Sequence, residues 1–238
     1  MNNKELDELV DLCNFLGRDI YQIQAAGGNV SVKLNATQML IKASGAKMKE
    51  VRANQGWLGI RYAHLPATFQ SIFDREPSAL KREIFYAKAI GGAAENSDKK
   101  PSMESGFHSV IQNKYTAHVH SIAGIILGMF PQPSAMETLQ KIFTDLPDIY
   151  FVPASLPGFE VSYSIQKLKI QSSGKIHLFI LKNHGLIWSG NNFDLLKKTI
   201  ADFENYFDLK FQTKKYGFFH ALGTSGCADK KIPQTKEN

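Results

Sequence analysis

Two short connections between strand-like segments constrain the fold of this chain more than any other feature. Residues 30–34 alternate apolar and polar side chains, and the turn Asn35-Ala36-Thr37 leads at once into a second strand-like segment, residues 39–42. Residues 178–181 are all apolar and continue through a turn at 182–185 into residues 186–188. Strands joined by so few residues pair antiparallel. The sequence therefore predicts an antiparallel or mixed sheet rather than an all-parallel one.

Helical patterns separate these strands. Leu6, Leu9, Cys13 and Leu16 recur at the spacing of one helix face, which predicts an amphipathic helix over residues 4–17. Further helices are expected over residues 78–91, from Pro101 to about Asn113 with Ser102 as N-cap, over 123–129, over 160–170 and from 191 to about 214, and further strands at 57–62, 116–121 and 149–152. This mixture predicts a layered α/β fold, with residues 1–238 as a single domain and a flexible tail from about residue 223.

Composition and charge exclude several functional classes. The formal net charge is +6, but the basic doublets are scattered and no basic stripe with interleaved aromatic residues occurs, which disfavours nucleic-acid binding. A positive field suits a small anionic substrate. The longest apolar stretch, residues 122–130, is interrupted by two glycines and is too short to span a bilayer. With two cysteines and an acidic, amphipathic start, we expect a cytoplasmic protein without a membrane partner.

Three of the seven histidines are placed to bind a metal ion. His118 and His120 are two residues apart on a predicted strand, so both side chains point to the same face. His184 lies in a turn at a strand end, where it can be aimed at a neighbouring strand. Three imidazoles with one open position are typical of a catalytic zinc site. The alternative is that these side chains merely line a polar face of the sheet.

A carboxylate and several small-residue loops complete the pattern. Glu104 lies in the expected first turn of a helix, fourteen residues before His118, and is a candidate acid/base or ligand. The alternative is a glutamate that is favoured there by the helix dipole. Backbone N–H groups in glycine-rich turns can bind anions. Candidates for such a site are Gly28, Asn29, Ser44, Gly45 and Ser102.

Five motifs in this order resemble the class II aldolase/adducin family. They are GGNVSVK at residues 27–33, Lys42-Ala43-Ser44-Gly45, Pro101-Ser102-x-Glu104-x-x-x-His108, His118-x-His120 and Asn183-His184-Gly185. That family includes fuculose- and rhamnulose-phosphate aldolases, together with related epimerases, dehydratases and decarboxylases. The resemblance covers nearly the whole chain. It implies a three-layer α/β/α fold with a central, mainly antiparallel sheet, and a homotetramer with sites at subunit boundaries.

The resemblance also implies roles for some residues of these motifs. His118, His120 and His184 are similar to the ligands of a Zn²⁺ ion, for which Mn²⁺ or Co²⁺ is the alternative. Glu104 resembles the carboxylate that ligates the resting metal and then acts as acid/base. The residues that resemble phosphate-binding loops are Gly28, Asn29, Ser44, Gly45 and Ser102.

The function that the resemblance implies is that of a zinc-dependent lyase. It would act as an aldolase on a phosphorylated ketose or related sugar acid, through a metal-stabilised enediolate. An epimerase, a dehydratase or a decarboxylase would use the same metal site, and a non-catalytic adducin-like module is a further alternative. Residues 121–148 contain no tyrosine, so the catalytic tyrosine of some family members is unassigned among Tyr150, Tyr163 and Tyr216.

Overall fold

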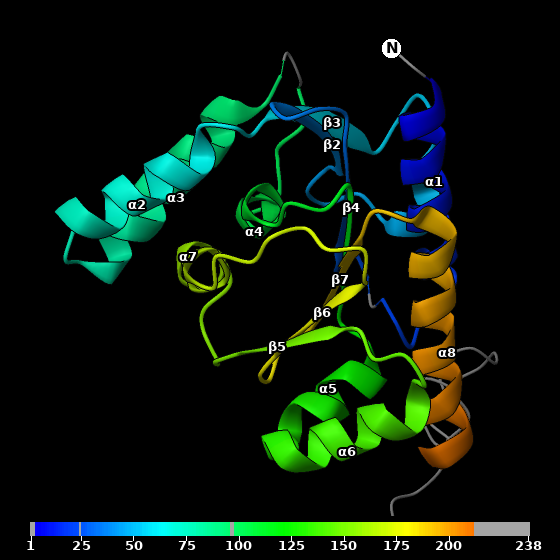
Figure 1. Ribbon diagram of the computed structural model, residues 1–238. Coiled ribbons are helices and arrows are strands. Elements are labelled where there is room, and N and C mark those ends of the chain that lie inside the picture. The colour runs from blue at the N-terminus through cyan, green and yellow to red at the C-terminus, as the bar shows by residue number, and fades with distance from the viewer. Residues whose placement is uncertain (1–2, 24, 96–97, 212–238) are drawn as a thin grey trace, which may run out of the picture.

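Seven strands form one sheet in the computed structural model, which describes residues 3–23, 25–95 and 98–211 (Figure 1). The strand order is β3-β2-β1-β4-β7-β6-β5. Every neighbouring pair is antiparallel except β5 and β6, which are parallel. The mainly antiparallel sheet is therefore confirmed. The strands are β1 (Asn29–Lys33), β2 (Gln38–Lys42), β3 (Trp57–Arg61), β4 (Tyr115–Val119), β5 (Asp148–Val152), β6 (His177–Leu181) and β7 (Gly185–Gly190).

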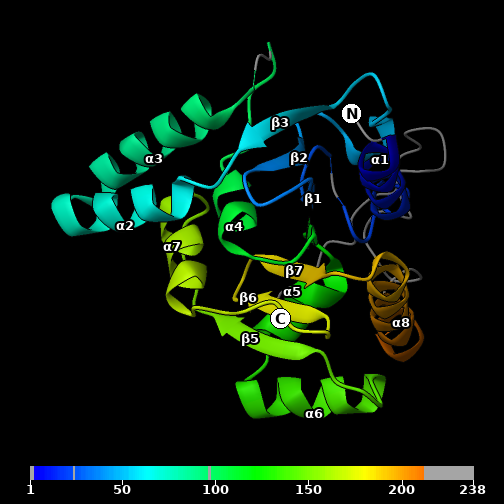
Figure 2. The same ribbon diagram turned by 45° about the horizontal axis from the view of Figure 1, so that its top comes forward.

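Helices cover both faces of this sheet, which gives the expected three layers (Figure 2). The helices on one face are α1 (Asn3–Gly17), α5 (Ile122–Met129), α6 (Gln132–Ile142) and α8 (Phe193–Phe211), with the short η1 (Met48–Glu50) beside α1. Those on the other are α2 (Leu65–Arg75), α3 (Ala79–Ala93), α4 (Ser105–Val110) and α7 (Phe159–Lys167). In the described part of the chain, no helix is long and apolar enough to cross a membrane.

The alternation along β1 explains how polar groups come to lie inside the fold. Val30 and Val32 belong to the core beneath α1 and α8. Ser31, which lies between them and therefore points to the opposite face, hydrogen-bonds the His108 imidazole of α4 at 2.7 Å. The face of the sheet beneath α4 is thus partly polar, and the candidate site lies at one end of it.

Two expectations for the local structure around the site are wrong. The helix expected from Pro101 begins only at Ser105, and its N-cap residue is Glu104 rather than Ser102. The Ser102 hydroxyl instead accepts a hydrogen bond from the Glu104 N–H at 3.2 Å and another from the Asn29 side chain at 3.2 Å, so its loop is tied to β1. The strand expected over 116–121 ends at Val119, because Ser121 already caps α5 through the Gly124 N–H.

Two helices were not expected from the sequence, namely α2 and α6. The remaining expected helices and strands are present with bounds that differ by a few residues. The expected end of the last helix near Lys214 and the flexible tail from Gly223 lie outside the described residues.

Candidate metal centre

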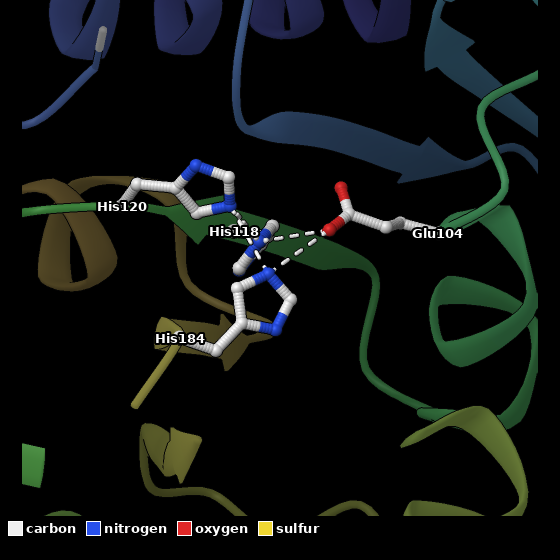
Figure 3. A group of neighbouring side chains, drawn as sticks. All are labelled: Glu104, His118, His120 and His184. Atoms are coloured by element: carbon white, nitrogen blue, oxygen red, sulfur yellow. Dashed lines mark hydrogen bonds and ion pairs between the residues drawn. The ribbon is translucent and has the colours of Figure 1, made fainter. Parts of the chain in front are cut away.

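Four side chains from three regions of the chain converge at one end of the sheet (Figure 3). His118 lies on β4, His120 follows the end of that strand, His184 lies in the turn between β6 and β7, and Glu104 precedes α4. Each can direct one nitrogen or oxygen atom inward, and these atoms all lie within 4.8 Å of one another. The three predicted histidines and the predicted carboxylate are thus brought together.

The turn that carries His184 depends on two unusual backbone positions. Asn183 has a φ of 60°, a left-handed conformation that asparagine tolerates better than most residues. At Gly185, an added Cβ would lie only 2.3 Å from the carbonyl oxygen of Val119 on β4. Glycine therefore allows β7 to begin directly against the end of β4. As a result, the His184 Nε2 lies 3.2 Å from the His120 Nε2.

A hydrogen bond to the backbone fixes the orientation of the His118 ring. The fully buried His118 ring places Nδ1 2.9 Å from the carbonyl oxygen of Leu186, which can only accept a hydrogen bond. Nδ1 therefore carries a proton, and Nε2 is the nitrogen that faces Glu104 and His120. A backbone carbonyl that orients an imidazole in this way is typical of metal-ligating histidines.

The spacing of the ligand atoms fits one small ion. The His118 and His120 Nε2 atoms are 2.9 Å apart, and the Glu104 Oε1 lies 3.2 Å from His118 and 3.3 Å from His184. Two nitrogens bound at about 2.0–2.1 Å in tetrahedral geometry are separated by about 3.3 Å. The donor set of three imidazoles and one carboxylate could therefore hold a divalent ion without large rearrangement.

The electrostatics of the cluster keep Glu104 and His120 in the form that binds a metal. Burial by itself would raise the pKa of Glu104, but the nearby His118 and the hydrogen bonds to His118 and His184 lower it well below its usual range. Burial, with His118 close by, lowers the pKa of His120 to about 4. Near neutral pH the cluster therefore offers an ionised carboxylate together with a neutral His120 imidazole.

Of the five residues expected to bind phosphate, the structure places Asn29 and Ser102 beside the cluster. The Asn29 side chain donates to the other Glu104 oxygen, Oε2, and to the Ser102 hydroxyl. Gly28 has a φ of 69°, and an added Cβ there would collide with Ile23 and with the His118 carbonyl, so its glycine is needed for packing. Ser44 and Gly45 are exposed, and the space around Gly45 is open.

Lys42 is a residue of this region to which the sequence analysis gave no role. Its side chain is only 1% exposed, and its ammonium donates to the carbonyls of Ala46 at 2.7 Å, Ala43 at 3.1 Å and Ala26 at 3.4 Å. Lys42 thereby ties together the two small-residue loops. Burial lowers its pKa, against the opposing effect of Cys13 and Glu104. The only signal in the sequence was a lysine in an otherwise apolar strand.

His108, Tyr150 and Tyr163 make their described contacts with residues outside the cluster of four ligand side chains. His108 is fully buried against Ser31 and stacks on Phe107, and burial lowers its pKa to about 3, so it is a neutral packing residue. Tyr163 donates to Gln70 on the α2 side, and Tyr150 packs on Phe179. Tyr216 lies outside the described residues.

The chain matches the family model described as the class II aldolase and adducin N-terminal domain over residues 7–211. No curated protein sequence matches it significantly.

Several solved structures share the fold at low sequence identity. One is the N-terminal class II aldolase domain of a conserved protein from Thermoplasma acidophilum, with 19% identity, a TM-score of 0.65, and coverage of 85% of this chain and 93% of that one. Another is an L-fuculose-1-phosphate aldolase from Thermus thermophilus, with 14% identity, a TM-score of 0.54, and coverage of 89% and 98%. A sugar-phosphate aldolase from Thermotoga maritima shows 15% identity, a TM-score of 0.55, and coverage of 94% and 98%.

Proposed function

Because the chain belongs to the class II aldolase and adducin family, we propose that it is a zinc-dependent aldolase acting on a phosphorylated ketose or related sugar acid. The observation that carries this proposal is the convergence of Glu104 with three histidines whose ligand atoms fit one ion. A module that had lost catalysis would not need to keep this set. Epimerase, dehydratase and decarboxylase activities are the alternatives, because they would use the same residues.

His118, His120 and His184 would hold the ion. Three imidazoles favour zinc, and manganese or cobalt are the alternatives. When bound, the ion would supply Lewis-acid stabilisation of negative charge on the substrate carbonyl oxygen. Two features of the chain position these ligands. The Leu186 carbonyl orients His118, and the close approach of the strands at Gly185 positions His184.

Glu104 would move the proton at the carbon next to the substrate carbonyl. Its Oε1 faces the histidines, and its Oε2 accepts from Asn29, so the carboxylate is oriented from both sides. A carboxylate held in this way is preorganised for proton transfer. The Asn29 and Ser102 side chains thereby position the proposed acid/base in addition to their proposed contact with phosphate.

The substrate phosphate would bind at the loops on this side of the sheet. Ser44 and Gly45 face open space, and the Ser44 N–H bond to the Lys100 carbonyl holds their loop beside the segment that leads to Ser102. Lys42 keeps the loops of Gly28 and Gly45 in place. Fixing the phosphate would fix the position of the reacting carbons relative to Glu104.

We also propose a cytoplasmic homotetramer. The exposed apolar side chains of Leu80, Ile84 and Phe85 on α3 support assembly, because a soluble monomer rarely gathers large apolar groups on one exposed helix face. The free, buried thiol of Cys13 supports a reducing compartment.

The decisive experiment combines metal analysis with a cleavage assay. Purified protein should carry about one divalent ion per chain, and replacing both His118 and His184 by Ala should abolish it. Zinc-loaded protein should cleave at least one ketose 1-phosphate, with L-fuculose 1-phosphate and L-rhamnulose 1-phosphate as first probes and sugar-acid phosphates next. Wild-type protein that takes up no metal during zinc titration would refute the proposal.

A further inference from the structure

A cavity of about 640 Å³ lies on the α4 and α7 side of the sheet, and the metal-ligand cluster contributes no residue to it. Its lining includes the end of β1, the connection between β3 and α2, and the C-terminal ends of α4 and α7. The two helices lie side by side on this face (Figure 2). Its volume lies within the range of about 300–1,000 Å³ that is typical of small-molecule sites.

The cavity is separated from the candidate metal centre by the length of β1. Asn29, at the first end of this strand, contacts Glu104, whereas Lys33, at its last residue, lines the cavity. Four residues of extended chain span about 13 Å. A ligand in this cavity would therefore not touch the metal-binding residues.

The charges that line the cavity are all positive. Lys33 and Lys169 lie on its wall, and none of its described lining residues is acidic. The Lys33 ammonium donates to the Ile111 carbonyl and lies 4.9 Å from the centre of the Tyr62 ring. An ammonium has three donors, and no carboxylate within the described residues forms an ion pair with this one. A partly buried cation without a counter-ion is a costly arrangement that an anionic ligand would relieve.

We propose that this cavity binds a small organic anion with an apolar body. The anionic group would lie against the Lys33 ammonium, with Lys169 at the exposed rim. The apolar body would pack on Val110, Ile170 and the ring of Tyr62, which line the same cavity. A carboxylate and a phosphate monoester share this chemistry, and the experiment distinguishes them.

The protonation of Lys33 gives the proposal a readout of its own. Burial lowers the pKa of Lys33 to about 7. At pH 8 the side chain is therefore mostly neutral in the free protein, and an anion beside it stabilises the charged form. Binding at pH 8 should consequently take up a proton, and the affinity should rise as the pH is lowered through 7.

The test uses isothermal titration calorimetry and amide NMR shifts on the full chain. The probes are benzoate, phenyl phosphate and the neutral benzyl alcohol. At least one anion should bind saturably with a Kd of about 1 mM or tighter, and benzyl alcohol at least about tenfold more weakly. The NMR shifts should centre on residues 109–112 and 165–171. Titrations in two buffers of different ionisation enthalpy should reveal the proton uptake at pH 8.

Variants decide whether Lys33 carries the binding. Lys33→Met should weaken the anion at least about tenfold and abolish the proton uptake, because a charge-assisted hydrogen bond is lost. The matched control Lys198→Met, on the exposed side of α8, should leave both unchanged. If Lys33→Met does not fold, the exposed Lys169→Met decides, with an expected weakening of about two- to fivefold.

Three results would overturn the proposal: no saturable binding of either anion, equal binding of benzyl alcohol, or anion affinity that the lysine variants leave unchanged. Phenyl phosphate bound only at the metal cluster would give the last of these results. Because the readout is binding rather than turnover, failure here and failure of the proposed aldolase activity are distinguishable.

Discussion

Replacing Glu104 by Gln tests the central assignment of the candidate site. The substitution keeps the shape of the side chain but removes its charge and its ability to accept a proton. In the structure, Oε1 faces the His118 and His184 nitrogens and Oε2 accepts from Asn29. A Gln side chain can keep an oxygen toward only one of these sides and turns an N–H₂ donor toward the other.

Two effects of different size follow. Without metal, the variant loses charge-assisted hydrogen bonds of about 1.5–3 kcal/mol each, partly replaced by neutral ones, so its free energy of unfolding should fall by about 1–3 kcal/mol. With metal, the three histidines remain as ligands and should retain the ion with reduced affinity. The rate should fall by about 10²- to 10⁴-fold, because general acid/base assistance is lost.

The assay measures metal content, kcat and urea unfolding on the same preparation, with Glu137→Gln as the control. Glu137 is exposed on α6, so its replacement should change none of the three quantities. If Glu104 acts only through the dipole of α4, its replacement costs about 0.3–1 kcal/mol of stability and leaves the rate unchanged. A Glu104→Gln variant with normal metal content and near-normal kcat would refute the role proposed for this carboxylate.

Three further predictions concern two residues near the site and one exposed helix face. Gly185→Ala should lower the free energy of unfolding by about 1–3 kcal/mol and weaken metal retention, because the added Cβ would lie 2.3 Å from a carbonyl oxygen of β4. The control Gly91→Ala, where the space is open, should change neither quantity. Equal effects of the two substitutions in urea unfolding and metal analysis would contradict this. Lys42→Met should cost about 2 kcal/mol or more by leaving loop carbonyls unpaired, and an unchanged urea midpoint would exclude such a role. If the proposed tetramer forms through the exposed apolar face of α3, Ile84→Glu should dissociate it in light scattering, whereas the control Leu209→Glu should not. A monomeric wild type would refute the proposed assembly itself.

Strand pairing near the site could be predicted because it depends on local features. The short turns after β1 and β6 allow only antiparallel pairing, and both pairs are present. The helices α2 and α6 were not expected, although the sequence carries a signal for each. Both have a proline in the first turn, which favours a helix start, and apolar residues at helical spacing, namely Leu65, Phe69 and Ile72 in α2 and Ala135, Leu139 and Ile142 in α6. Local spacing alone did not show that these apolar residues pack against distant elements.

The capping of α4 shows, at the site itself, that a local sequence signal can be overridden by a long-range contact. A serine after a proline is a good local N-cap signal, which favours Ser102. In the fold, its hydroxyl is bound by the Asn29 side chain, 73 residues away in sequence, and the helix begins three residues later. A long-range hydrogen bond thus replaced the local cap, and the consequence is that Glu104 points toward the histidines.

The sequence by itself determined which side chains are available at the candidate metal centre. The spacing of His118 and His120, the turn around His184 and the glycine that follows it are local properties of the chain. Only the tertiary structure decided that Lys42 would hold two loops together and that Lys33, at the far end of β1, would lie without a carboxylate partner among the described residues. The physical reason is that the energy of a buried charge depends on which carbonyls and carboxylates the fold brings near it, and those partners come from distant parts of the chain.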